Sequence, residues 1–308
     1  MLEALILTPD SQPLTRNIED YPEGIIIPID KPYRWTSADV IRKVKYAAIR
    51  HFGKKNLKVG HAGTLDPLAT GVLLVCIGKA TKLAETLQSH DKEYIAGVTF
   101  GATTPSYDLE KEIDRFFPHE HITAEAITEA LPAFIGEQDQ IAPLFSAKSV
   151  DGVRAYELAR KLHKEGKTLD EAAEELIRVA RINITALELL GFMCQSATSE
   201  DPRLPGGRHP LAVGGMSSPA VTLSQSNANA SNRINVTDNS ALGLPRAEIR
   251  MACSKGTYVR AFARDLGETL GSGAHLDSLQ RSRSGQFRVE NALTVEQAIS
   301  LFTPKRDS

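Results

Sequence analysis

The sequence predicts an α+β protein with a mixed, largely antiparallel central sheet and flanking helices. Several stretches are apolar and β-branched and predict strands, at residues 24–29, 71–77, 92–100, 178–193 and 247–253. Stretches with helical periodicity lie between some of these strands. Turn signals that join strands directly outnumber strand–helix–strand units, and this balance favours antiparallel pairing over a doubly wound parallel sheet.

The chain opens with a mixed, proline-containing segment, residues 1–23, which predicts an edge strand or a loose leader. The strand at 24–29 contains Pro28, which suggests an edge position because proline has no N–H to donate. Ser37 can cap a helix over residues 38–52. Basic residues on and after this helix indicate either an ordinary solvated face or a phosphate-binding patch; they are Arg42, Lys43, Lys45, Arg50, Lys54, Lys55 and Lys58.

The stretch Val59–Leu83, VGHAGTLDPLATGVLLVCIGKATKL, places one carboxylate on a turn that leads into a buried strand. Asp66 stands directly before Pro67, which disfavours the α region and keeps Asp66 extended or in a turn. The flanking glycines let another backbone or a ligand approach closely. Two interpretations remain open on composition: a turn that merely contains an aspartate, or a rigid scaffold that presents a reactive group.

Local signals predict the remaining elements. A helix is expected over 79–89 and another over 123–134, where Thr123 can act as the N-cap. An Asp-Gly step at 151–152 predicts a turn, and a helix is expected from about 153 to 164. Further along, the signals predict a turn over 254–257, a helix over 258–270 closed by Gly271, a basic strand or hairpin over 281–294, and a short helix over 294–302.

Residues 196–245 differ in character from the rest of the chain. They are dense in Ser, Asn, Gly, Pro and Ala, with almost no aromatic residues and no sustained periodicity. Such a segment cannot bury enough apolar surface to offset the entropy lost on ordering. We therefore predict a flexible low-complexity insert within a single domain made of residues 24–195 and 246–303.

The composition is that of an ordinary globular domain and argues against several classes of protein. The chain has 308 residues and a net charge of −2, so contacts with RNA would need positive charge that is local. Cys76, Cys194 and Cys253 form no CxxC pair, which argues against a zinc site. No apolar run approaches the ~20 residues of a membrane span and the start lacks a signal-peptide pattern, so a cytoplasmic protein is expected.

Four pieces could converge on one site: Lys31, the Asp66 loop, Tyr94 and the segment 253–267. The last piece contains Arg260, whose guanidinium fork is a natural partner for a carboxylate such as Asp66. Tyr94 and Tyr258 could offer aromatic faces to an unpaired base. From the residues alone, a surface arginine and two half-buried core tyrosines are the commoner outcomes.

Six motifs follow one another along the chain: DKPYRWTSADV, GHAGTLDPLATG, KEYIAGVTFG with TTPSYD, SAKSVDGVRAYELAR, CSKGTYVRAFARDLG and HLDSLQRSRSGQF. Through them, the chain closely resembles the TruB-type tRNA pseudouridine synthases over about residues 24–190 and 246–300. Arg34 stands where that family usually has glycine, and Ser149 displaces its usual lysine. Because the chain ends soon after Phe302, the C-terminal PUA-type RNA-binding domain of many members is expected to be absent.

The resemblance implies that the protein converts uridine 55 in the T loop of tRNA to pseudouridine, with no cofactor and no metal. Asp66 would be the nucleophile, Tyr94 would stack on the target base, and Arg260 would hold Asp66. The implied substrate-binding residues are His61, Lys31, Tyr258, Leu279 and Lys255. The expected partner is the T stem-loop of tRNA, with no membrane involved and the protein acting as a monomer.

Two other functions make different demands on the sequence. A tRNA-binding chaperone that acts on the tRNA elbow without turnover would not need an anion beside a polyanionic backbone, so Asp66 separates the two hypotheses. A metal-dependent phosphodiesterase would need clusters of carboxylates or histidines, and the sequence contains none that we can identify.

Overall fold

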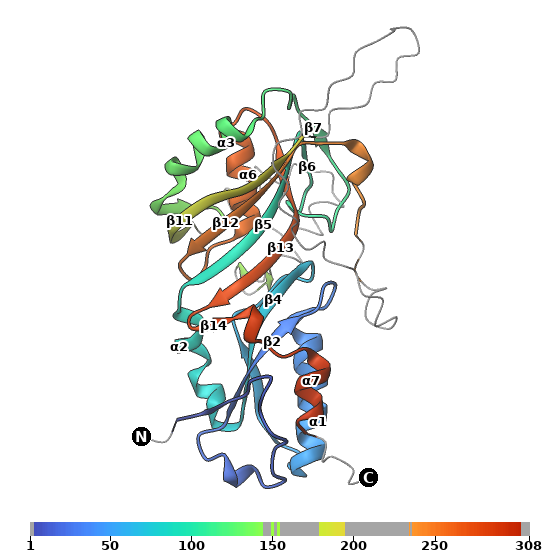
Figure 1. The fold of residues 1–308 in the computed structure, drawn as a ribbon, viewed down its shortest axis with the longest axis vertical. Helices are drawn as coiled ribbons and strands as arrows, with labels where there is room; N and C mark the ends of the chain where they lie inside the picture. Colours follow the sequence, from blue (N-terminus) through green and yellow to red (C-terminus); the bar gives the residue numbers. More distant parts are fainter. Residues whose placement is uncertain are drawn as a thin grey trace.

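A mixed sheet of ten strands forms the centre of the protein. The computed structural model describes residues 3–143, 149–150, 153–154, 179–194, 234 and 236–302. The main strand order is β1-β2-β4-β13-β5-β12-β11-β8, with β3 beside β4 and β14 beside β13 (Figure 1). The strands are β1 (Leu5–Ile6), β2 (Ile25–Lys31), β3 (Val59–Ala62), β4 (Ala69–Ile77), β5 (Lys92–Phe100), β8 (Gly136–Gln140), β11 (Ala180–Met193), β12 (Arg246–Cys253), β13 (Ala274–Ser284) and β14 (Phe287–Arg288).

The sheet is largely antiparallel, and this confirms the predicted fold class. Only β1 with β2 and β4 with β13 pair in parallel within this sheet of the described residues. The other neighbours are antiparallel, including the long ladders between β5, β12 and β13. The resulting sheet is twisted along the long axis of the molecule (Figure 1).

Helices flank the sheet at both of its ends. Helices α1 (Ser37–Phe52) and α7 (Val295–Ser300) lie side by side near β2, and α2 (Ala84–Ser89) lies on the other side of β4 (Figure 1). Helix α3 (Ala124–Ala130) packs against β11, and α6 (Val259–Thr269) packs against β13 and β5. Short 3-10 helices are η1 (Ile18–Asp20), η2 (Gly78–Leu83), η3 (Leu131–Phe134), η5 (Ser240–Leu242) and η6 (Val289–Asn291). Two small hairpins pair β6 (Ala102–Thr103) with β7 (Arg115–Phe116) and β9 (Ser149–Val150) with β10 (Val153–Arg154).

Strand β4 is buried on both faces, which explains its continuous apolar run. Leu73 and Val75 join the large core that includes the apolar face of α1. Leu74 and Cys76 face the opposite way, into a smaller core that includes Leu87 of α2. Burying each such side chain contributes about 1.5–3 kcal/mol, so this strand is a rigid base for the loop that precedes it.

Local signals placed most helix ends within a residue. Thr123 caps α3 as predicted, and its hydroxyl accepts from the Ala126 N–H. The cap of α1 is Thr36 rather than Ser37, because Thr36 and Asp39 form a reciprocal capping box. Ser37 instead turns inward and is buried. The predicted N-cap was therefore wrong by one residue. The Ser37 hydroxyl forms hydrogen bonds with Leu65, in the loop that carries Asp66.

Pro28 lies inside the sheet rather than at its edge. On one side it pairs with Leu74 of β4. On the other side lies the backbone of Leu293, whose N–H donates to the Pro28 carbonyl at 2.9 Å. The nitrogen and the carbonyl of one strand residue point to the same side. The missing N–H of Pro28 therefore faces Leu293 and leaves the ladder with β4 uninterrupted.

Other predicted segments are only partly described. The leader contributes the edge strand β1 and buries Leu7 and Leu14. Of the predicted insert, residues 196–233 and 235 lie outside the described residues. Its last part, 236–245, carries η5. The helix expected from 153 begins instead with strand β10, and 155–164 also lie outside the described residues.

Replacing Gly71 by alanine is expected to destabilise the protein by about 2–3 kcal/mol. Gly71 has φ +96°, and a Cβ atom there would overlap the backbone of Arg281 on the adjacent strand β13. Urea denaturation checks this value, with Gly60→Ala as the control because nothing lies within 4 Å of a Cβ at Gly60. Equal stability of both variants would contradict the close approach of β4 and β13.

Candidate active site

The candidate active site is built on the loop between β3 and β4, which carries Asp66. The hydroxyl of Ser37 accepts from the Leu65 N–H at 3.0 Å and donates to the Leu65 carbonyl at 3.1 Å. On the other side of the carboxylate, the Ala69 N–H donates to the Asp66 carbonyl at 3.1 Å. The backbone of the loop is therefore fixed immediately before and after the residue that bears the carboxylate.

Two buried basic side chains, Arg281 and Lys31, also hold the backbone of this loop. Arg281 donates from Nε to the Val72 carbonyl at 2.7 Å and from a terminal nitrogen to the Gly63 carbonyl at 3.0 Å. Lys31 donates to the Pro67 carbonyl at 3.2 Å. Both side chains are almost completely buried. Hydrogen bonds from the charged guanidinium of Arg281 are stronger than neutral ones, so the backbone of the loop is held firmly.

This geometry differs from the substrate-binding role predicted for Lys31. Its ammonium also donates to the carbonyls of Pro32 at 3.0 Å and Trp35 at 2.6 Å. With three carbonyl partners and no exposed surface, the side chain faces the loop and not the solvent. Lys31 therefore positions the Asp66 loop.

The free energy of unfolding is expected to depend on pH through Lys31. Burial lowers the pKa of Lys31 to about 7 from 10.5, and the charge of Asp66 acts in the opposite direction. Between these values the unfolded chain holds a proton that the folded protein lacks, so stability rises with pH. Urea denaturation at about pH 7.5, 8.5 and 9.5 should show wild type gaining about 1 kcal/mol per pH unit over Lys31→Met. Parallel profiles would show instead that the three carbonyls keep the ammonium charged.

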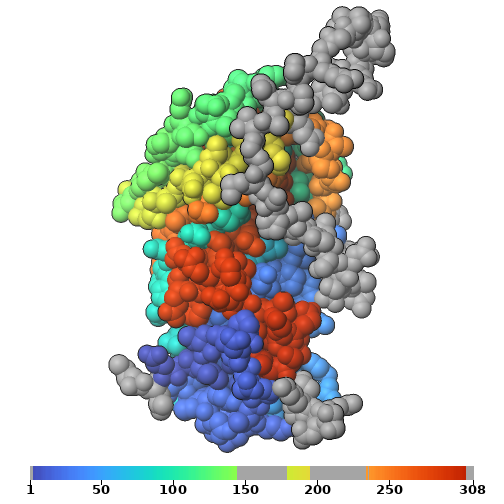
Figure 2. All heavy atoms as spheres, in the orientation of Figure 1, coloured from blue at the N-terminus to red at the C-terminus, as the bar shows by residue number. Residues whose placement is uncertain are grey.

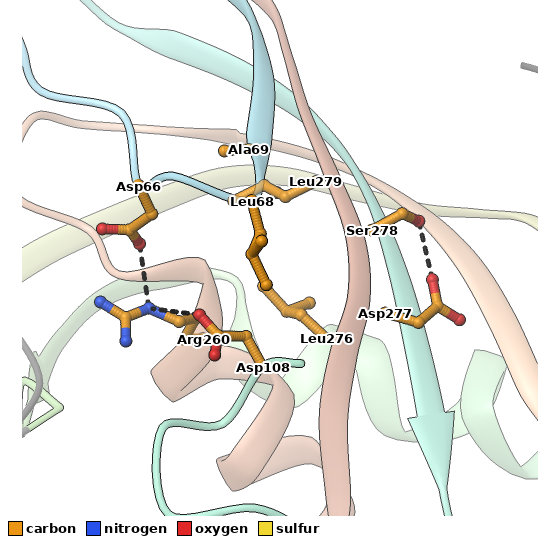
Figure 3. Close-up of a pocket in the computed structure, with 9 residues that line it drawn as sticks. All are labelled: Asp66, Leu68, Ala69, Asp108, Arg260, Leu276, Asp277, Ser278 and Leu279. Atoms are coloured by element: carbon orange, nitrogen blue, oxygen red, sulfur yellow. Dashed lines mark hydrogen bonds and ion pairs between the residues drawn. The ribbon is translucent and has the colours of Figure 1, made fainter. Parts of the chain in front are cut away.

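Asp66 forms an ion pair with Arg260. Arg260 lies in the first turn of α6, which brings its guanidinium to the loop. The distance from Arg260 Nε to Asp66 Oδ2 is 2.9 Å, and the side chains are 4% and 39% exposed respectively (Figure 3). The arginine is thus the buried partner and the carboxylate the accessible one. The contact to Asp66 is made through Nε, and one terminal nitrogen of the same guanidinium donates to the Ser106 carbonyl at 3.0 Å.

A second carboxylate, Asp108, completes the group and was not among the predicted site residues. Its Oδ2 lies 3.8 Å from Arg260 Nε, and its Oδ1 accepts from the Ser106 hydroxyl at 2.6 Å. Burial raises the pKa of Asp108, and the guanidinium of Arg260 opposes that rise. Its position as the last residue of the TTPSYD motif was the one signal in the sequence that could have identified Asp108.

The carboxylates and Arg260 line a small pocket with an apolar wall. The cavity has a volume of about 20 Å³, which is room for about one water molecule. Leu68, Leu276 and Leu279 form the wall between Asp66 and Asp277 (Figure 3). An accessible carboxylate beside apolar side chains can act as a nucleophile or as a base, because the wall excludes bulk water from the reacting atoms.

The structure brings some of the predicted residues together and leaves others outside this pocket. Leu279 lines it, opposite Ala69 in the ladder between β13 and β4. Tyr94 is 9% exposed and lies on β5 between Met251 and Arg281 of the neighbouring strands. Burial raises the pKa of Tyr94, and the charge of Arg281 opposes the rise. Tyr94 is therefore enclosed beneath the site rather than part of the pocket wall.

The remaining predicted residues, His61, Tyr258 and Lys255, are not among the residues that line the small pocket. His61 is half-buried on β3, where burial and the charge of Arg281 lower its pKa. Tyr258 precedes α6, and its backbone exchanges hydrogen bonds with the Gln140 side chain at 2.8 and 3.1 Å. Lys255 is exposed on the turn before it. None of these three lines the small pocket formed by the described residues.

The fold and the site together define a mixed-sheet α+β protein in which a buried arginine holds an accessible aspartate. A family model described as TruB family pseudouridylate synthase (N terminal domain) matches residues 50–200. The proteins named tRNA pseudouridine synthase B of Phocaeicola vulgatus and Bacteroides thetaiotaomicron are 45% and 43% identical to the chain over 277 residues, which are 90% of this chain and 92% of each relative. The chain belongs to the TruB family of pseudouridylate synthases.

A further relative agrees with this membership, and a solved structure shares the fold. The tRNA pseudouridine synthase B of Flavobacterium johnsoniae is 38% identical to this chain over 278 residues, which are 90% of this chain and 95% of that relative. A chain in a structure of an H/ACA RNP bound to a substrate RNA containing 2'-deoxyuridine has a TM-score of 0.50 at 20% identity, over 90% of this chain and 53% of that chain. At this identity, the likeness concerns the fold alone.

The described residues lack two structural features. No helix among them is long and apolar enough to cross a membrane. The described residues also contain no group of three or more His, Cys, Asp or Glu side chains placed to hold a metal ion.

Proposed function

We propose that this protein is a tRNA pseudouridine synthase that isomerises uridine 55 in the T loop, with Asp66 as the nucleophile. The observation that carries the proposal is the 39%-exposed carboxylate of Asp66, ion-paired at 2.9 Å to a buried arginine beside an apolar wall. The relatives named tRNA pseudouridine synthase B support the substrate class. On this proposal the protein acts in the cytoplasm, as a monomer, on the T stem-loop of tRNA.

The reaction needs no redox change and no energy input, and its atoms balance within the nucleotide. The bond from N1 of uracil to C1' of the ribose breaks, the base turns, and a bond from C5 to C1' forms. C5 loses its proton to water and N1 gains one. Asp66 attacks the sugar or the base, or removes a proton, and Arg260 keeps its carboxylate aimed at the reacting atoms.

The target base has to leave the RNA stack before this chemistry can occur. The pocket volume of about 20 Å³ is too small for a uracil ring, so the leucine wall has to move when the base enters. Leu279 then packs on the base, and Tyr94 becomes the stacking surface and proton-transfer group beneath it. His61, Tyr258 and the exposed Lys255 contact the surrounding RNA, with Lys255 free to meet a phosphate.

Release of tritium from RNA labelled at C5 of uracil tests this function. The full chain is incubated with a T stem-loop RNA, and one tritium should be released for each target uridine converted. A matched RNA with cytidine at the target position serves as the control and should release none from that position. If the labelled RNA binds but no tritium is released, the protein is a tRNA-binding chaperone and the proposed activity is wrong.

A further inference from the structure

Arg34 and Tyr107 are the two residues other than glycine that have a positive φ among the described residues. Arg34 has φ +63° in the loop that joins β2 to α1, and Tyr107 has φ +56° directly before Asp108. A residue with a side chain keeps this left-handed conformation only where surrounding contacts enforce it. The TruB family usually has glycine at position 34, which adopts the conformation without strain. The contacts of the Arg34 side chain should therefore show what this chain gains from an arginine there.

The side chain of Arg34 holds the end of the predicted insert. A terminal nitrogen donates to the Ile234 carbonyl at 2.7 Å and joins residues 200 positions apart in the chain. We call the described residues 234 and 236–245 the strap. At its other end the strap runs into β12, where the Phe100 N–H donates to the Pro245 carbonyl at 2.9 Å. Arg34 thus fixes one end of the strap and β5 fixes the other.

Between its ends, the strap binds the segment that carries the second carboxylate of the site. The Thr237 N–H donates to the carbonyl of Leu109, which follows Asp108, at 2.9 Å. The Leu276 N–H donates to the carbonyl of Tyr107, which precedes Asp108, at 3.0 Å. The backbone is therefore held on both sides of Asp108, by β13 before it and by the strap after it.

The loop that carries Arg34 also supports the first carboxylate. Lys31 stands before this loop and donates to the Pro67 carbonyl at 3.2 Å. Ser37 stands after it and exchanges hydrogen bonds with Leu65 at 3.0 and 3.1 Å. Arg34 consequently lies between two residues that fix the backbone on either side of Asp66.

The middle of the same loop faces the second carboxylate. Burial raises the pKa of Tyr33, the charge of Arg34 opposes the rise, and the charges of Asp108 and Asp277 add to it. Such effects require the Tyr33 side chain to lie within range of those charges. The loop is thus close to Asp108 as well as attached to the support of Asp66.

Both carboxylates face one nitrogen atom, so their relative position matters. Arg260 Nε lies 2.9 Å from Asp66 Oδ2 and 3.8 Å from Asp108 Oδ2. A small displacement of Asp108 changes how the guanidinium is shared between the two. The strap connects the support of one carboxylate with the backbone of the other, through Arg34 at one end and Thr237 in its middle.

We propose that Arg34 is a positioning residue for pseudouridine formation, and that it acts by holding the strap against the Asp108 segment. The proposal rests on the proposed function, since it concerns the same reaction. Arg34 contacts the backbone of the strap and acts on the reacting groups only through Leu109, Asp108 and Arg260. The insert, which lies outside the family resemblance, thereby supports the site through its last residues.

Three substitutions at position 34 test the role of the hydrogen bond. Arg34→Met keeps the length of the side chain and removes the donor, whereas Arg34→Lys keeps a cation that can donate to the same carbonyl. Arg34→Gly restores the residue usual in the family. In single-turnover pseudouridine formation on saturating T stem-loop RNA, Arg34→Met and Arg34→Gly should be about tenfold slower, within the hundredfold that a 1 Å misplacement can cost. Arg34→Lys should stay within about twofold.

Two further measurements separate positioning from loss of fold or of RNA binding. Arg34→Gly should unfold at the same or a higher urea concentration than wild type, because glycine suits the left-handed conformation. Filter binding should give a Kd within about twofold of wild type for all three variants. Arg181→Met is the control and should keep the wild-type rate, since this exposed arginine pairs with Glu137 and Asp139 at the edge of the sheet.

Thr237 provides an independent test of the same connection. Thr237→Pro removes the N–H that donates to Leu109, and Thr237→Ala keeps it. The first variant should be about tenfold slower and the second within about twofold of wild type. Combining Arg34→Met with Thr237→Pro should add no more than about twofold, because both break one connection. Hydrogen exchange of the Thr237 amide, measured by NMR, should accelerate about tenfold in Arg34→Met and stay unchanged in Arg34→Lys.

Several results would overturn the proposal. If Arg34→Met accelerates exchange at Thr237 but converts RNA at the wild-type rate, the strap does not position the site. If Arg34→Lys is as slow as Arg34→Met, the hydrogen bond to Ile234 is not the cause. A loss of affinity without a loss of rate would assign Arg34 to RNA binding. Failure of the proposed function is a separate result, because wild type would then convert no RNA.

Discussion

Replacing Asp66 by asparagine is expected to reduce pseudouridine formation below detection while tRNA binding stays within about tenfold, or 1.4 kcal/mol. Asparagine keeps the size of the side chain but removes the negative charge, and both nucleophilic attack and proton removal fail without that charge. The loop should survive the change, because Ser37, Lys31 and Arg281 hold its backbone and not its carboxylate. Single-turnover pseudouridine formation on a T stem-loop RNA measures the first effect, and filter binding measures the second.

The same assay distinguishes the roles around the carboxylate. Asp114→Asn is the control and should keep full turnover, since this exposed residue lies outside the pocket. Arg260→Lys should lower turnover less than Asp66→Asn, because lysine keeps the charge but cannot contact Asp66 and also donate to the Ser106 carbonyl in the same geometry. Substantial turnover by Asp66→Asn would remove Asp66 as the nucleophile. Loss of binding would make the loop structural.

Replacing Arg281 by methionine is expected to lower the free energy of unfolding by about 4 kcal/mol. Methionine fills much of the same volume but leaves the carbonyls of Val72 and Gly63 without their buried donor. Each buried polar group left unsatisfied costs about 1–3 kcal/mol. Turnover should fall as well, even in conditions where the variant stays folded, because the Asp66 loop loses one of its anchors.

Arg283, two residues further along β13, provides a matched control for this prediction. It has the same side chain on the same strand, is only half-buried, and donates to the Gly285 carbonyl two residues away at 3.1 Å. Arg283→Met should cost less than about 1 kcal/mol. Urea denaturation of both variants gives the comparison. Similar losses for the two variants would mean that the buried hydrogen bonds of Arg281 contribute little to stability.

Much of the fold was predictable because its signals are local. The strand expected at 92–100 corresponds to β5 (Lys92–Phe100), since its apolar residues and its boundaries are both encoded nearby. The Asp66 loop was predictable because proline and glycine restrict its backbone within a few residues. The pairing of Asp66 with Arg260 followed from charge and from the resemblance, and the ion pair is present in the structure.

What the sequence did not predict depends on distant contacts. Arg281 lies in a stretch whose sequence predicts a basic strand or hairpin. It is buried because β13 pairs with β4, which lies about 210 residues earlier in the chain. Strand β8, GEQDQ, has few apolar residues because it is an edge strand with alternating exposure. Asp108 could not be distinguished from an ordinary turn residue, since its burial comes from the approach of α6.

The position of β13 has a consequence for how the chain folds. The half of the sheet made by β1, β2 and β4 meets the half made by β5, β12, β11 and β8 only through β13, among the described strands. During synthesis the ribosome completes β4 about 200 residues before β13. The two halves of the sheet therefore cannot pair with each other until β13 has been made. Contacts of such long sequence separation slow folding, and the unpaired edges of β4 and β5 are exposed meanwhile. Arg281 arrives with that last long strand, and the loop that carries Asp66 gains its final anchor only when the sheet closes.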